Sequence, residues 1–510
     1  MSWISSRNSL DCASLCKEIE APLILPKHIH SKSEESKVNY TVIPLSVLLR
    51  DRYTNIFNNP QPTLIDRSHP PPSTQKFTPL PLAFEQTRLS NGVPLYLIPH
   101  QAQPFLSLRL LLKRGARNDG PLPGLADITC DLLSAGAGSR DAITFAADVE
   151  RLGANLGVEA SRDVIRLELD TLTRFLPEAI PLAADMVLRP LFDPDELKRE
   201  RKQKLSTLKQ NRSEPDWLAA TALRRTLYGS NPYGHPIEGE KDSVARITIE
   251  DCKNFHHQQI IPAHAMFIVA GDVTVDEIQD RLEAGFSGWR GDVPSLIAPV
   301  IPQPAAAGRL LILDRLGSAH TAIRIGRIGL SRKDPEAIPL LVLNTLLGDY
   351  FNSRLNNLLR ESMGFTYEAW SYVEMTVDPG MIVVGTSVRA DRVAKTVGAI
   401  FGELDRIASK EVGEEELEIV KGYIAGRQAL ASETPDQIAG MVTTIALHDL
   451  PADYYRTFIE QIRSLTPEDL LKTAKRFLRS EDMTVVVAGD AEKLRSELAP
   501  FGRVEIVRSK

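Results

Sequence analysis

The chain has 510 residues, of which 43% are hydrophobic, 25% charged and 6% aromatic, a composition that excludes fibrous and wholly disordered proteins. Its 60 basic and 66 acidic residues give a net charge of −6, so we predict no nucleic-acid partner, which would require a basic patch or domain. Four cysteines are too few for a disulfide framework, and no uncharged apolar run reaches the roughly 18 residues of a membrane span.

Residues 1–82 differ in composition from the rest of the chain. Seven prolines fall within residues 54–82, which favours extended or loop structure. The first thirty residues lack the apolar core of about 7–15 residues that a secretory signal contains. They also carry Asp11, Glu18 and Glu20, which a transit peptide would avoid. We therefore expect a poorly structured extension and a cytoplasmic protein.

An internal repeat indicates the domain organisation. Residues 247–273 and 465–491 align without gaps. Each segment opens with a threonine, Thr248 or Thr466, followed by acidic residues, which is typical of a helix N-cap. About ten helical residues, a β-rich strand and a second helix follow in both copies. The pattern predicts two homologous domains.

The domain limits follow from the start of each half and from the segment between them. Residues 105–112 and 321–328 are strand-like, and residues 291–308 are proline-rich, as a linker is. We predict an extension over residues 1–82, a first domain over 83–290, a linker over 291–308 and a second domain over 309–510. Strands mixed with long helices predict the α+β class, each domain having a mostly antiparallel sheet packed with several helices.

Several segments, taken in order, carry a family resemblance. They are LSNGVPLYLIPH (89–100), RGARNDGPLPGLADITCDLLSAGAGSR (114–140), LAADMVLRPLFDPDELKRERKQKLSTLKQ (182–210) and NTLLGDYFNSRLNNLLRESMGFTYEAWSY (344–372). In this order the chain resembles the insulinase/mitochondrial-processing-peptidase family of zinc peptidases, in its bacterial two-domain form. The resemblance runs from about residue 84 to residue 508. It implies a half-clamshell of two domains around a peptide substrate.

The resemblance also implies a zinc site, whose motif is changed in this chain. Active members carry HxxEH on a helix: two histidines bind Zn²⁺, and the glutamate is the general base. A later helix supplies a third ligand, a glutamate seven residues after another acid. The chain has Asp127 and Asp131 at the histidine positions and Cys130 at the base position. The later helix keeps Glu200 but has Thr207 at the ligand position. We therefore expect no metal on this chain.

Two other uses of these residues have less support. Asp127, Cys130 and Asp131 could bind a different metal, but two carboxylates and a thiolate mix hard and soft donors and have no evident fourth ligand. Cys130 could act as a nucleophile, but the local sequence offers no histidine as its base. We favour an abandoned site.

The second half keeps an arginine and a tyrosine, Arg354 and Tyr367, in the pattern SRLxxxLRExxGxxY. By resemblance, such a pair faces the zinc across the closed chamber and contacts the substrate backbone or polarises the scissile carbonyl. A cation and a phenol can stabilise a developing oxyanion. The alternative is structural: Arg354 forms a salt bridge to a carboxylate such as Glu361 or Asp349, and Tyr367 only packs.

Two local patterns accompany this pair. Leucine and phenylalanine recur at helical spacing and predict an apolar helical stripe with Arg354 at its edge (Leu347, Phe351, Leu355 and Leu358). In the first half, residues 156–172 contain an alternation from Val164 to Leu169 that predicts a half-buried strand. By resemblance that strand lies at the sheet edge, where a peptide can add as an extra strand. A contact with a partner, or a purely structural place in the sheet, explains the pattern equally well.

These features lead to three functional hypotheses. In heterodimeric bacterial members of the family, one subunit carries the zinc motif and the other only the Arg/Tyr pair. We predict the second kind: a subunit that is not active alone, encloses a peptide substrate and donates Arg354 and Tyr367 to an HxxEH-bearing homologous partner, on which the zinc lies. The alternatives are a zinc-less scaffold or substrate-presenting protein and, with least support, an autonomous metallopeptidase. A periplasmic location would follow from the resemblance alone.

Overall fold

The computed structural model describes residues 23–25, 41–43, 82–291, 308–315 and 320–508. The chain divides into two compact units, residues 1–75 and 76–510. In the first unit, β1 (Leu23–Leu25) and β2 (Thr41–Ile43) pair antiparallel. The predicted extension over 1–82 and the predicted linker over 291–308 lie almost entirely outside the described residues, so both stay predictions.

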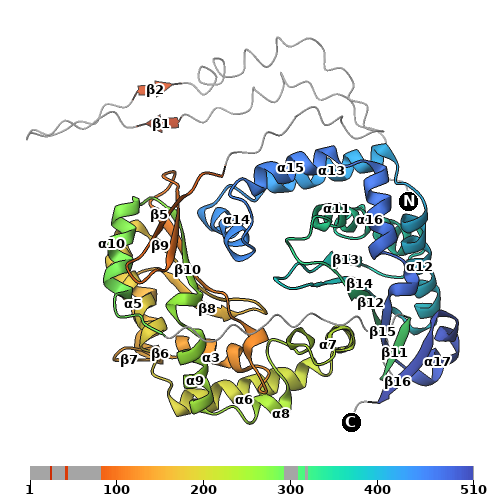
Figure 1. The fold of residues 1–510 in the computed structure, drawn as a ribbon, viewed down its shortest axis with the longest axis horizontal. Coiled ribbons are helices and arrows are strands. Elements are labelled where there is room, and N and C mark those ends of the chain that lie inside the picture. The colour runs from red at the N-terminus through yellow and green to blue at the C-terminus, as the bar shows by residue number, and fades with distance from the viewer. Residues whose placement is uncertain (1–22, 26–40, 44–81, 292–307, 316–319, 509–510) are drawn as a thin grey trace, which may run out of the picture. The chain divides into compact units, whose positions relative to one another are not determined.

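The first of two six-stranded sheets in the second unit is built from residues 85–271 (Figure 1). All neighbours in this sheet are antiparallel except β4 and β10, which are parallel. The predicted strand over 105–112 is confirmed as β5. The strand order is β3 (Glu85–Arg88), β4 (Pro94–Pro99), β10 (Ala265–Gly271), β5 (Phe105–Leu112), β9 (Ile165–Leu172), β8 (Asn155–Ala160).

The second sheet repeats this plan within residues 309–508. Its first three neighbouring pairs are antiparallel, and the pairs of β11 with β15 and with β16 are parallel. Both sheets are therefore mostly antiparallel, and the predicted α+β class is confirmed. The strand order is β13 (Ala369–Val373), β14 (Met381–Arg389), β12 (His320–Ile328), β15 (Thr484–Gly489), β11 (Arg309–Asp314), β16 (Arg503–Arg508).

The helices pack around these sheets, and the repeated helix starts are confirmed. Thr248 and Thr466 cap α9 and α16, and each forms a reciprocal capping box with an aspartate three residues later. In the first half the helices are α3 (Leu125–Ser134), α4 (Ala142–Arg151), α5 (Leu176–Leu188), α6 (Pro194–Asn211), α7 (Pro215–Tyr228), α8 (Lys241–Val244), α9 (Ile249–Gln259) and α10 (Val275–Phe286). In the second they are α11 (Ala337–Leu347), the π-helix η5 (Asn356–Ser362), α12 (Val393–Ser409), α13 (Glu414–Leu430), α14 (Pro435–Leu447), α15 (Tyr454–Ser464), α16 (Pro467–Phe477) and α17 (Ala491–Leu498).

One face of each sheet is covered by a helix from the other half of the chain (Figure 1). Helix α7 packs on β12 and β15, where Leu223 lies in a buried cluster with Val383 and Val486. Helix α14 packs on β10 and β5, where Val442 is buried with Ile268. Each buried aliphatic side chain contributes about 1.5–3 kcal/mol. The two halves of the unit therefore stabilise each other.

Each of these two helices also forms an ion pair, through its first turn, with the sheet on which it packs. Arg109 on β5 binds Asp436 in the first turn of α14. Arg324 on β12 binds Asp216 in the first turn of α7, with 2.6 Å between Nη2 and Oδ1. A carboxylate in the first turn is also favoured by the helix dipole.

The predicted helical stripe from Leu347 to Leu358 is wrong in its first half. Helix α11 ends at Leu347, and Phe351 is 66% exposed. The break comes at Gly348, where an added Cβ would lie 2.4 Å from the backbone nitrogen of Ser371. A close approach of two backbones thus ends the helix, and Leu355 is buried beside the separate helical segment η5.

Among the described residues, none of the helices combines the length and the apolar character needed to span a bilayer.

Candidate functional site

Helix α3, which carries the changed metal motif, is anchored at its start by a buried carboxylate. Asp119 accepts hydrogen bonds from the backbone nitrogens of Gly124 (2.6 Å) and Ala126 (2.8 Å), which are free donors at a helix N-terminus. Burial raises the pKa of Asp119 to about 7, although both hydrogen bonds oppose this shift. Asp119 thus fixes the start of the helix that carries the predicted positions of the changed metal motif.

The two aspartates at the predicted histidine positions are bound by a lysine of α6, the third helix after α3. Asp127 and Asp131 both form ion pairs with Lys204 of α6, and the Nζ atom lies 2.7 Å from Oδ2 of Asp131. Burial acts to lower the pKa of Lys204, but the two aspartates outweigh burial and raise it. Lys204 is therefore a firmly protonated ammonium.

The remaining positions of the predicted motif are Cys130, Glu200 and Thr207. Cys130 is 1% exposed, and burial, followed by the charges of Asp127 and Asp131, raises the pKa of its thiol well above the usual range. A thiol in such surroundings is not a nucleophile at neutral pH. Thr207 is exposed on α6. Burial and the charge of Asp131 raise the pKa of Glu200.

This donor set does not fit zinc. Within the ranges that the structure describes, no group of three or more His, Cys, Asp or Glu side chains is arranged to hold a metal ion. A catalytic zinc site needs three protein ligands and an open position for water. Here an ammonium already contacts both carboxylates of α3.

Arg354 is enclosed by two carboxylates. Its Nε and Nη2 atoms bind both oxygens of Glu416 on α13, at 2.7 and 2.6 Å, and its Nη1 atom binds Glu403 on α12 at 3.0 Å. Burial opposes ionisation, but the hydrogen bonds to Glu416 and Glu403 outweigh it and raise the pKa of Arg354. The carboxylates expected in the structural alternative, Glu361 and Asp349, pair instead with Arg360 and Arg427, both at 3.5 Å.

Tyr367 lines a cavity of about 900 Å³, whose other lining residues come from the second half of the chain and from Asp216 of α7. It precedes edge strand β13 and is 95% exposed. The arginines that line this cavity include Arg360, Arg324 and Arg389, but Arg354 is not a lining residue. The structure therefore places Tyr367 and Arg360 on the wall of the same cavity, which Arg354 does not line.

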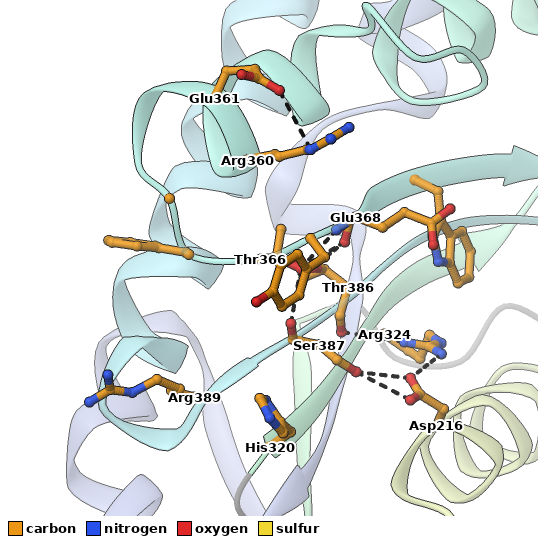
Figure 2. A pocket seen from close by; sticks show the side chains of 14 residues that line it. Asp216, His320, Arg324, Arg360, Glu361, Thr366, Glu368, Thr386, Ser387 and Arg389 are labelled. Atoms are coloured by element: carbon orange, nitrogen blue, oxygen red, sulfur yellow. Dashed lines mark hydrogen bonds and ion pairs between the residues drawn. The ribbon is translucent and has the colours of Figure 1, made fainter. Parts of the chain in front are cut away.

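The arginines of the cavity differ in how strongly they are bound. Arg324 is 8% exposed, pairs with Asp216 and lies 4.9 Å from the centre of the Trp370 ring. Figure 2 shows Arg324 and Ser387 converging on Asp216, away from the helical segment that bears Arg360. Arg360 is 37% exposed, contacts Glu361 at 3.5 Å and stacks over Phe351 at 4.6 Å. It thus keeps a solvated guanidinium.

Sequence reasoning missed Arg360, although a signal was present. Arg360 and Tyr367 fall within one continuous stretch, LRExxGxxY, in which Gly364 adopts a φ of +61° two residues after the end of η5. That turn separates the helical arginine from the tyrosine by only a short loop. In the sequence, Arg360 lies closer to Tyr367 than Arg354 does, and this spacing could have identified Arg360 as the partner of Tyr367.

The two sheets differ in how far their corresponding edge strands, β8 and β13, are covered by neighbouring segments. The predicted alternating strand is β9, which lies between β5 and β8, so the edge strand is β8 rather than the alternating one. The corresponding edge strand, β13, is covered: the Ser371 nitrogen donates to the Gly348 carbonyl at 3.2 Å, and the Ala369 nitrogen to Asn356 Oδ1 at 3.0 Å. Beside Gly157 of β8, an added Cβ would meet no atom within 4 Å.

Two family models match the chain. Insulinase (Peptidase family M16) matches residues 96–241, and Peptidase M16 inactive domain matches residues 246–423.

Individual proteins show the same similarity. An uncharacterised zinc protease of Streptomyces coelicolor is 24% identical over 75% of this chain and 85% of its own length. A non-peptidase homologue of Helicobacter pylori is 21% identical over 74% of this chain and 87% of its own length. The crystal structure of a peptidase M16 inactive domain from Pseudomonas fluorescens superposes with a TM-score of 0.76 and 25% identity, covering 80% of this chain and 98% of that one.

Proposed function

The chain belongs to the insulinase family of peptidases (family M16), as a member of the inactive type, and from this premise we propose that it is the non-catalytic subunit of a heterodimeric zinc peptidase. Its partner would be a homologous chain that carries HxxEH and binds the zinc. The subunit would help to enclose a peptide substrate and would complete the partner's active site from the opposite side.

The observation that carries this proposal is the exposed pair of Arg360 and Tyr367 on one cavity. Our prediction from the sequence named Arg354 together with Tyr367. The contacts of Arg354 with Glu403 and Glu416 use three of its five N–H groups, and Arg354 does not line the cavity. We therefore propose Arg360 and Tyr367 as the donated residues, and a structural role for Arg354.

The chemistry of this pair suits a peptide bond under attack. A solvated guanidinium and a phenol donate hydrogen bonds to a carbonyl oxygen, and these bonds strengthen as negative charge develops on that oxygen. The partner's zinc would supply the activated water. Strand β8, at the edge of the first sheet, could pair with an extended segment of the substrate by main-chain hydrogen bonds.

Reconstitution tests this proposal. The purified chain should contain well under one equivalent of zinc and should cleave no peptide. Mixed with an HxxEH-bearing homologue from the same organism, it should form a complex and produce peptidase activity that neither chain has alone. A full equivalent of zinc on this chain, or an HxxEH chain equally active without it, would count against the proposal. A complex without any gain in activity would favour the scaffold alternative.

A further inference from the structure

We propose that Lys204 is a tethered cation that takes the place of the family's metal ion and closes the site against divalent cations. Its ammonium contacts Asp127 and Asp131, which stand where two metal-binding histidines would stand. The two aspartates are four residues apart on α3 and so share one face of the helix. The ammonium group of the Lys204 side chain thus lies between the carboxylates of Asp127 and Asp131, at the position that the family's metal would occupy.

The charges around Lys204 show why a cation is needed there. The side chains of Asp127, Asp131 and Lys204 are 22%, 32% and 14% exposed, so solvent screens them only in part. Glu200 lies one turn before Lys204 on α6, and its carboxylate pairs with Arg199 at 2.7 Å. Two partly buried carboxylates without a counter-charge are costly. Lys204 supplies that charge without a dissociable ion.

The same contacts give Lys204 a structural role that a metal could have had. Helix α3 packs against α6 on one side and against edge strand β8 on another. Lys204 links α3 to α6 through two ion pairs. The position of α3 beside β8 is thereby maintained whether or not metal is present in solution.

Removing the ammonium should create a cation site of a different kind. Without Lys204, the carboxylates of Asp127 and Asp131 would remain one turn apart on α3 and would lose the ammonium that each of them contacts. Carboxylate oxygens alone favour hard ions such as Mn²⁺, Mg²⁺ or Ca²⁺ over zinc. We therefore expect the variant Lys204→Met of the full chain to bind Mn²⁺ measurably more tightly than the unsubstituted chain does.

Thermal unfolding and Mn²⁺ titration of four proteins test this. The proteins are the unsubstituted chain, Lys204→Met, the control Lys209→Met at an exposed position of α6, and the triple variant Asp127→Asn/Asp131→Asn/Lys204→Met. Lys204→Met should have a lowered Tm that Mn²⁺ restores. The control should match the unsubstituted chain, and the triple variant should recover Tm without responding to Mn²⁺.

Each outcome decides the proposal. If Lys204→Met alone does not fold but the triple variant does, charge compensation by Lys204 is supported. If the triple variant also fails to fold, Lys204 acts through something other than its charge and the proposal is overturned. Mn²⁺ binding by the unsubstituted chain with the affinity of Lys204→Met, or no response of a folded Lys204→Met, would also overturn it.

Discussion

Two arginines six residues apart, Arg354 and Arg360, have opposite surroundings. The guanidinium of Arg354 forms hydrogen bonds with carboxylates of α12 and α13. The guanidinium of Arg360 lines a cavity and has a more distant ion pair, with Glu361 at 3.5 Å. The carboxylates of Arg354 come from residues 403 and 416, far along the chain. Local spacing identified the arginine-rich stretch but could not reveal these distant partners, so it could not separate the structural arginine from the exposed one.

This difference predicts opposite effects of two substitutions. Arg354→Ala should lower the free energy of unfolding by about 3 kcal/mol, because it leaves Glu416 and Glu403 partly buried without their main counter-charge. Arg360→Ala should change it by less than about 0.5 kcal/mol, as exposed positions do. Chemical denaturation of both variants measures the contrast. Equal losses of stability would show that the two arginines do not differ as the contacts imply.

His448, directly after α14, contributes to the acid sensitivity of the fold, and among the described histidines its pKa is lowered the most. Burial, followed by the charge of Arg332, lowers the pKa of His448 to about 4, well below its value of about 6.5 in an unfolded chain. Between these values the unfolded state binds the proton and the folded state does not. The contribution of neutral His448 is therefore fully present above pH 6.5 and is lost as the pH falls toward 4.

The corresponding experiment compares Tm at pH 7.5 and pH 5. The unsubstituted chain should lose Tm on acidification, and His448→Gln should lose less. His257→Gln, at an exposed position of α9, is the control and should follow the unsubstituted chain. An unchanged pH dependence in His448→Gln would contradict the role given to this histidine.

At the scale of elements, sequence patterns correctly predicted those strands and helix starts that depend on neighbouring residues alone. The strand over 105–112 and the helix starts at Thr248 and Thr466 follow from alternation and capping, and the structure has them where expected. The stripe through Leu347 failed because the contact of Gly348 with Ser371 is a tertiary one. The covering of each sheet by a helix of the other half is likewise invisible in either half alone.

That exchange of helices predicts that the two halves stay together when the chain is cut. A protease site engineered within residues 291–308 should give two fragments that still co-elute in gel filtration, because α7 and α14 each bury an apolar face on the other half. Adding Arg109→Ala and Arg324→Ala should weaken the association, since it removes the ion pair at the start of each helix. Fragments that separate at once would contradict this picture.

At the scale of the molecule, the repeat predicted two homologous domains, and two sheets of matching order are present. The changed zinc motif could also be identified from the sequence, because each substitution is visible at its own position. The cation that fills the site could not, because Lys204 reaches Asp127 and Asp131 from another helix. In the second half, Arg360 and Tyr367 line one cavity.

The most direct test of the proposed function is peptide turnover by the reconstituted complex with an HxxEH-bearing partner. We expect Tyr367→Phe and Arg360→Ala each to lower kcat at least about tenfold, as loss of a transition-state donor does, while zinc on the partner and complex formation stay unchanged. Folded Arg354→Ala should keep the turnover of the unsubstituted complex. Full turnover in Arg360→Ala/Tyr367→Phe would contradict the donated site.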